Sequence, residues 1–165
     1  MQHRFETLVR AFCEIEKYSQ PERLLEGESM ELHGVEFSLL YEEDIAVDAM
    51  HLRVVFGNAP LKNETAIYRA LLKENHAGYC GNGPGFCVSP ASGRVVYLLK
   101  MSLCDVSPEM LLNTMLTFIG KVKEWRSTYF LTSTARCDGH SPAACSIVIA
   151  GTSVTGNGLT SANLV

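Results

Sequence analysis

The stretch that decides the fold is residues 76–103, HAGYCGNGPGFCVSPASGRVVYLLKMSL. Its glycines follow a helical pattern and lead into two apolar segments separated by a Ser-Pro-Ala-Ser-Gly turn. A phosphate-binding loop has the reverse order, because its glycines follow a strand and open a helix. Pro84 also removes a backbone N–H that a phosphate would use. We therefore interpret the glycines as a corner before a β-hairpin.

Alternation of apolar and polar side chains marks the strands of this chain. It occurs in residues 29–34 (SMELHG), 35–43 (VEFSLLYEE) and 50–57 (MHLRVVFG), where β-branched and aromatic residues are frequent. This pattern predicts half-buried antiparallel strands. The two arms of the hairpin continue it with Phe86 and Val88, then with Val95, Tyr97, Leu99, Met101 and Leu103.

Three helices are expected around these strands. Residues 3–18 form an amphipathic pattern that Pro21 is expected to end, and the segment that follows Asn63 repeats apolar residues at helical spacing. Ser107, Pro108 and Glu109 form a start signal for a third helix, which continues to about residue 131. The predicted order is α-β-β-β-α-β-β-α, an α+β domain over residues 1–131 with a twisted antiparallel sheet flanked by helices.

Residues 132–165 differ in composition from the rest of the chain. Of these residues, 21 are Ser, Thr, Ala, Gly or Asn, and the only formal charges are Arg136 and Asp138. The composition predicts a flexible tail or a loosely attached extension. Within it, CSIVIAG (145–151) is a candidate strand.

The charge of the chain argues against nucleic acid as a partner. The net charge is −4, and nine carboxylates lie between Glu22 and Asp48 with Arg23 as the single cation. Such a region repels nucleic acid and anionic lipid, and it is either a solvated acidic face or the complement of a basic protein. The sequence shows no apolar run long enough to cross a membrane and no signal-peptide pattern, so we expect a cytosolic protein without membrane insertion.

No motif in the sequence predicts catalysis, a metal or a cofactor. The six cysteines show no C-x-x-C spacing, and no G-x-S-x-G pattern occurs. We therefore expect a protein that is not an enzyme, with no catalytic residues, metal ligands or cofactor. Two alternatives stay open: a thiol or acyl-transfer enzyme that uses Cys80 or Cys87, and an α+β domain that binds a small molecule in an enclosed pocket.

The order of these elements resembles the CesT/SycE family of class I type III secretion chaperones. The resemblance covers residues 1–130 and rests on the first helix, the VEFSLLYEE and LRVVFGNAP strands, the second helix, NGPGFCVSPASGRVVYLLKMSL and VSPEMLLNTMLTFIGKVKEW. It implies a homodimer without enzymatic activity in the bacterial cytoplasm. It also implies that the dimer holds the N-terminal region of an effector protein in partly extended form.

Candidate binding residues follow from the strand pattern and from the resemblance. Apolar residues on the face opposite the core indicate a protein-binding surface, unless dimerisation or a helix covers them, and residues 29–34 are expected to form an edge strand that can accept a partner strand. The candidates for effector binding are Met30, Leu32, Leu40, Val55, Val96 and Leu98. The second helix has a narrow apolar stripe, and the resemblance places the two-fold interface on it and on the next strand: Ile67, Ala70, Leu71, Phe86 and Val88.

Overall fold

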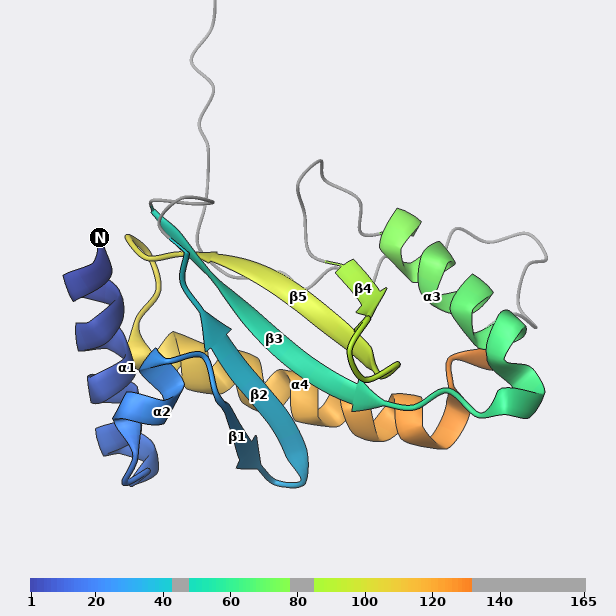
Figure 1. Cartoon of the computed structure of the whole chain (residues 1–165), viewed down its shortest axis with the longest axis horizontal. Helices are drawn as coiled ribbons and strands as arrows, with labels where there is room; N and C mark the ends of the chain where they lie inside the picture. The colour runs from blue at the N-terminus through green and yellow to red at the C-terminus, as the bar shows by residue number, and fades with distance from the viewer. Residues whose placement is uncertain (43–47, 78–84, 132–165) are drawn as a thin grey trace, which may run out of the picture.

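A computed structural model describes residues 1–42, 48–77 and 85–131 of the chain (Figure 1). The predicted tail 132–165, its candidate strand and the glycine-rich residues 78–84 lie outside these ranges. The helices and strands are α1 (Gln2–Glu16), α2 (Pro21–Leu25), β1 (Ser29–Leu32), β2 (Val35–Leu40), β3 (Ala49–Gly57), α3 (Glu64–Ala77), β4 (Gly85–Val88), β5 (Val95–Ser102) and α4 (Pro108–Thr128). A short 3-10 turn, η1 (Leu61–Asn63), precedes α3.

The five strands form a single sheet in the order β1-β2-β3-β5-β4, and every neighbouring pair is antiparallel. The predicted α+β class with an antiparallel sheet is therefore confirmed. β1 and β4 are the edge strands, one at each end of the strand order (Figure 1).

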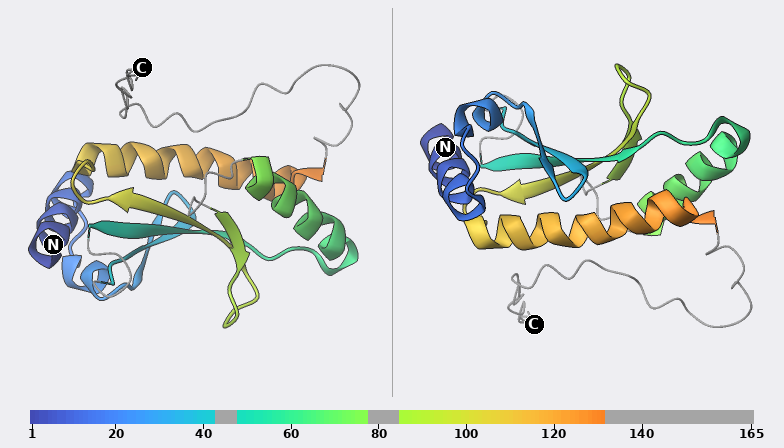
Figure 2. Two further views of the ribbon diagram at one scale, coloured as in Figure 1. Left: turned by 90° about the horizontal axis from the view of Figure 1, so that it is seen from above. Right: turned by 90° about the horizontal axis from the view of Figure 1, so that it is seen from below.

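The core lies between one face of the sheet and α4, which runs along that face (Figure 2). Ser107 caps α4 as predicted, because its Oγ accepts a hydrogen bond of 3.1 Å from the Met110 backbone N–H. One side of α4 is apolar and buried, whereas Leu116 on the same helix is exposed. The buried residues of α4 are Leu111, Met115, Phe118, Ile119, Val122 and Trp125.

The first helix ends earlier than expected. α1 stops at Glu16, where Lys17 takes a left-handed conformation with φ of 54°. Pro21 begins the short helix α2 instead of ending the first one, because a proline suits the first helical position, where no N–H is needed. α2 buries Leu24 completely in the core. This element was not predicted from the sequence.

A two-residue turn joins β1 to β2. His33 and Gly34 both have positive φ, of 51° and 79°, as a type I′ hairpin requires. The turn fixes the register, so that Leu32 lies opposite Val35. Arg126 near the end of α4 holds this corner, since its Nη1 donates to the Gly34 carbonyl at 2.9 Å.

None of the helices in the described ranges has both the length and the apolar character needed to span a membrane.

Candidate functional site

The residues predicted to bind an effector are divided between the two faces of the sheet. The core face packs against α4, and the opposite face is called the outer face from here on. Met30 lies opposite Phe37 on the core face and is almost fully buried. The outer face carries Leu40, Val55, Val96 and Leu98, as the strand pattern predicted, and the core face of β1 carries Met30 and Leu32.

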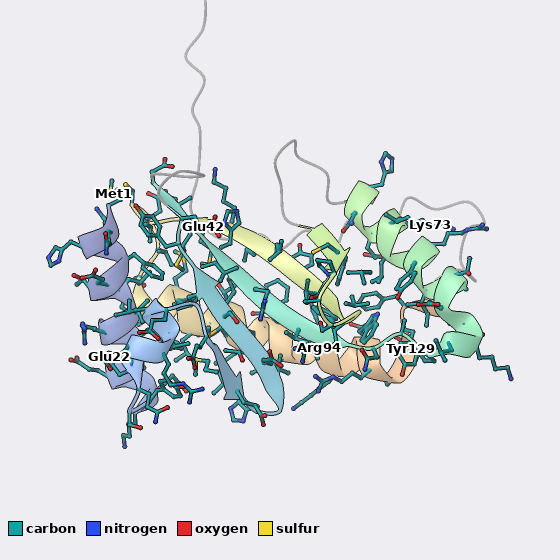
Figure 3. The ribbon with its side chains drawn as sticks, viewed as in Figure 1. Met1, Glu22, Glu42, Lys73, Arg94 and Tyr129 are labelled. Atoms are coloured by element: carbon teal, nitrogen blue, oxygen red, sulfur yellow. The ribbon has the colours of Figure 1, made fainter. Side chains whose placement is uncertain are left out.

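An ion pair covers the centre of the outer face. Val55 and Val96 are direct neighbours, and they are only 3% and 5% exposed. Arg94 (Figure 3) reaches from the start of β5 across β3 to Glu36 on β2, with Nη1–Oε2 and Nη2–Oε1 distances of 2.6 and 3.3 Å. Arg53 lies 3.9 Å from the same carboxylate. The apolar centre is therefore screened by charged side chains.

The hydrogen bonds between Arg94 and Glu36 favour the ionised form of the Glu36 carboxylate. The hydrogen bonds from Arg94 hold the pKa of Glu36 below its ordinary value, although desolvation acts in the other direction. Leu40 and Leu98 lie further along β2 and β5 on the same face and are half-buried. They are the more accessible part of the predicted patch.

The β1 edge of the sheet is open in the described part of the chain. The pair that closes a two-residue hairpin, here Leu32 and Val35, is a hydrogen-bonded pair. Hydrogen-bonded and non-hydrogen-bonded pairs alternate along the two strands, so Glu31 and Ser29 belong to non-hydrogen-bonded pairs. Their backbone N–H and C=O groups therefore point away from β2. No described residue bonds to these outward groups. β1 can therefore accept a further strand.

The β4 edge is closed at one position by a side chain from α3. Asn75 Nδ2 donates to the Phe86 carbonyl at 2.9 Å, and the Phe86 N–H donates to Asn75 Oδ1 at 2.7 Å. The amide of Asn75 thus takes the place of a neighbouring strand. It also ties α3 to the sheet (Figure 1).

The residues predicted to form a dimer interface have two different environments. Ile67, Ala70 and Leu71 are buried within the single chain, where Ile67 and Leu71 belong to the core. Phe86 is half-buried and packs edge-to-face on Phe56, with ring centroids 5.0 Å apart. Val88 is exposed.

Two further apolar residues near or on α3 also face solvent. Leu72 on α3 is 67% exposed, and Leu61 in the turn before α3 is 88% exposed. Neither leucine belongs to the apolar stripe that the sequence shows. That stripe is the face of α3 that packs on its own sheet.

A hollow of about 290 Å³ lies between α1, α2 and the end of β2. Its lining includes Phe5 and Tyr41, whose stacked rings lie 5.3 Å apart, together with Gln2, Glu6 and Leu25. Ligand pockets usually have volumes of about 300–1,000 Å³. This hollow lies at the lower end of that range, and nothing in it favours the small-molecule alternative.

Two of the described cysteines, Cys13 and Cys87, lie where a reactive thiolate is disfavoured. Burial raises the pKa of Cys13 and of Cys87, which disfavours the thiolate that a nucleophile needs. Cys80, the other thiol considered for catalysis, lies outside the described residues. Within the described ranges, no group of three His, Cys, Asp or Glu side chains is arranged to hold a metal ion.

Two features of these surfaces were missed in the sequence. The Glu36–Arg94 pair joins residues 58 positions apart, and it becomes visible only when β2 and β5 are placed on either side of β3. The Asn75–Phe86 contact depends on how α3 lies against β4. An asparagine near the end of a helix is too common to indicate such a contact.

Solved structures of secretion chaperones match the chain. One is the chaperone of the HopA1–SchA chaperone–effector complex, which shares the fold, with a TM-score of 0.54 and 15% identity over 76% of this chain and 95% of that chain. Another is the Yersinia pestis type III secretion chaperone SycH in complex with a fragment of YscM2. Its TM-score is 0.48, with 10% identity over 73% of this chain and 98% of that one.

Comparison at the level of sequence gives the family. No curated protein sequence matches the chain. The sequence model of the Tir chaperone protein (CesT) family matches residues 20–126, which include every strand of the sheet and nearly all of α4. The chain therefore belongs to the Tir chaperone protein (CesT) family.

Proposed function

We propose that this protein is a type III secretion chaperone that acts as a homodimer in the bacterial cytoplasm. In this proposal it binds the N-terminal region of an effector in partly extended form and keeps the effector competent for secretion, without catalysing a reaction. Membership of a chaperone family supports the general role. The structural neighbour SchA belongs to a chaperone–effector complex, which supports an effector as the partner.

The observation that carries the proposal is the open edge of β1. An extended effector segment would form backbone hydrogen bonds with the outward N–H and C=O of Glu31 and Ser29. Alternate side chains of that segment would then lie on the two faces of the sheet. Those on the core side would extend the apolar surface of Met30 and Leu32.

The outer face gives the effector a second place of contact. Side chains of a segment that crosses the sheet would meet Leu40 and Leu98 first, because these leucines are only half-buried. Val55 and Val96 become available where Arg94 moves aside. Apolar burial of this kind contributes about 25 cal/mol per Å², so it would set much of the affinity.

The homodimer would form through α3 and β4. Ile67, Ala70 and Leu71 would support this interface from within by holding α3 on its own sheet. Leu72 and Val88 would make contacts with the second copy, because they are apolar and exposed on these two elements. Burial against a partner would remove that apolar surface from water.

Binding measurements on a co-purified effector test this function. The full chain is purified from its native cell under mild conditions, and the effector that accompanies it is identified and divided into an N-terminal fragment and the remainder. Calorimetry should show binding of the N-terminal fragment and none of the remainder. Binding by the remainder alone, or chemical conversion of the fragment, would overturn the proposal.

A further inference from the structure

The chain contains its own candidate for the open edge of β1. The observations that point to it are the position at which α4 ends, the length of chain that follows and the composition of residues 145–150. None of them depends on the identity of an effector.

The end of α4 lies close to the strand ends of the sheet. Arg126 bonds to the Gly34 carbonyl in the β1–β2 turn and, through Nε, to the Phe56 carbonyl at the end of β3. Phe130 contacts Phe86 on β4, with ring centroids 6.1 Å apart. The chain that follows Leu131 thus begins at the sheet itself.

The next 13 residues, 132–144, are long enough to reach the far edge. Neighbouring strands lie about 4.8 Å apart, so a position beyond β1 is about 24 Å from β4. Thirteen extended residues span up to about 45 Å, and a flexible chain of that length has an average end-to-end distance of about 20 Å. A linker of 13 residues is therefore long enough to reach β1 without full extension.

Residues 145–150, Cys-Ser-Ile-Val-Ile-Ala, have the composition of a strand. Ile147, Val148 and Ile149 are consecutive β-branched residues, and the segment contains no charge, proline or glycine. The rest of residues 132–165 is dominated by small and polar residues. The segment therefore combines high strand propensity with a tether that begins at the sheet.

We propose that residues 145–150 of the same chain add to the open edge of β1 as a sixth strand when no effector is bound. The β4 edge is less suitable, because Asn75 already occupies the backbone groups of Phe86. A tether of this length gives an effective concentration in the millimolar range, so weak strand pairing is enough to keep the edge occupied. The tail then protects an edge that would otherwise pair with other chains.

This contact has a consequence that rests on the proposed function. If an effector uses the same edge, it must displace residues 145–150. The apparent affinity for the effector is then the intrinsic affinity multiplied by the fraction of time that the edge is free. Disruption of the segment would then tighten effector binding. This consequence can fail while the tail contact itself holds, so the two are measured separately.

Amide hydrogen exchange of the free, full-length protein tests the tail contact directly. The Glu31 N–H is the probe, because it points away from β2. Ile147→Pro together with Val148→Pro removes two adjacent N–H groups and blocks strand pairing in either register. We expect exchange at Glu31 to be about tenfold faster in this variant than in wild type, as for an edge that is about nine-tenths occupied.

A matched variant, Ser153→Pro with Val154→Pro, places the same change in the tail outside the segment and should exchange like wild type. Equal exchange at Glu31 in wild type and in the 147/148 variant would overturn the proposal. Protection that increases with protein concentration would also overturn it, because a second copy would then supply the strand. Effector affinity in the 147/148 variant separately tests the consequence for function.

Discussion

At the β4 edge, the Asn75 side chain donates to the Phe86 carbonyl and accepts from its N–H, whereas at the β1 edge no described residue bonds to the outward groups of Glu31. An unpaired strand edge invites pairing with other chains, and proteins usually block it. Within the described ranges, the chain blocks one edge with an amide from its own helix and leaves the other available. This difference is the basis of the proposal that β1 is the edge at which a strand is received.

The largest expected effect comes from closing the β1 edge. Glu31→Pro removes the outward N–H and places a ring where a partner strand would lie, while the bonds between β1 and β2 remain. We expect effector binding to weaken about 10–100-fold, equivalent to about 1.4–2.7 kcal/mol, as measured by calorimetry.

Glu31→Ala is the control for this variant, because it removes the same charge and keeps the N–H. Its affinity should stay within about twofold of wild type. Full-strength binding by a folded Glu31→Pro protein would show that the two edges do not differ in the way described here.

The second effect comes from opening the β4 edge. Asn75→Ala removes both hydrogen bonds to Phe86 and should lower the free energy of unfolding by about 1–3 kcal/mol in urea denaturation. Asn75→Asp keeps an acceptor for the Phe86 N–H but loses the donor, so its loss should be smaller. Glu74→Ala, at the exposed neighbouring position, serves as the control. If Asn75→Ala is as stable as this control, the side chain does not close the edge.

A third test examines the interface proposed beside the β4 edge. Leu72→Asp puts a carboxylate on an exposed position of α3 and should weaken the dimer at least about tenfold in sedimentation experiments, since the charge would be buried against the partner. Lys73→Asp is the neighbouring control. Leu71→Asp is unsuitable, because Leu71 is buried within its own chain and the change would unfold it. A wild-type protein that is monomeric at micromolar concentration would contradict the proposed dimer.

The smallest effect is expected from the ion pair on the outer face. Glu36→Gln should lower stability at neutral pH by about 0.5–1 kcal/mol, in the range of partly exposed pairs. Arg94 lowers the pKa of folded Glu36, so the contribution of the pair is complete above the ordinary value of 4.5 and is lost as the pH falls through the lowered pKa. Urea midpoints of wild type and variant should therefore converge in acid. A constant difference between them would contradict this assignment.

Local patterns in the sequence predicted most of the fold. The alternation of apolar and polar residues identified the strands and placed Leu40, Val55, Val96 and Leu98 on the outer face of the sheet. The Ser107–Pro108 signal located the start of α4. These features depend on neighbours along the chain. α2 was missed because Pro21 was taken only as the end of a helix, although proline is also well suited to begin one.

The candidate site was less predictable, because its properties depend on contacts between distant residues. The strand pattern showed that Val55 faces outward, but it could not show that Val55 is buried, or that an ion pair joins Arg94 to Glu36 across β3. The apolar stripe of α3 was found, but the sequence could not show that it packs on its own sheet. The state of each edge likewise depends on which residues the fold brings beside it.

The central claim is that β1 is the edge at which the effector is received. Amide exchange at Glu31 tests it most directly in the Ile147→Pro/Val148→Pro variant, where the chain's own segment cannot pair. On addition of the N-terminal effector fragment, the account predicts that exchange at Glu31 slows about tenfold or more, while exchange at Phe86 is unchanged. Saturating fragment that leaves Glu31 exchanging at its free rate would contradict the claim.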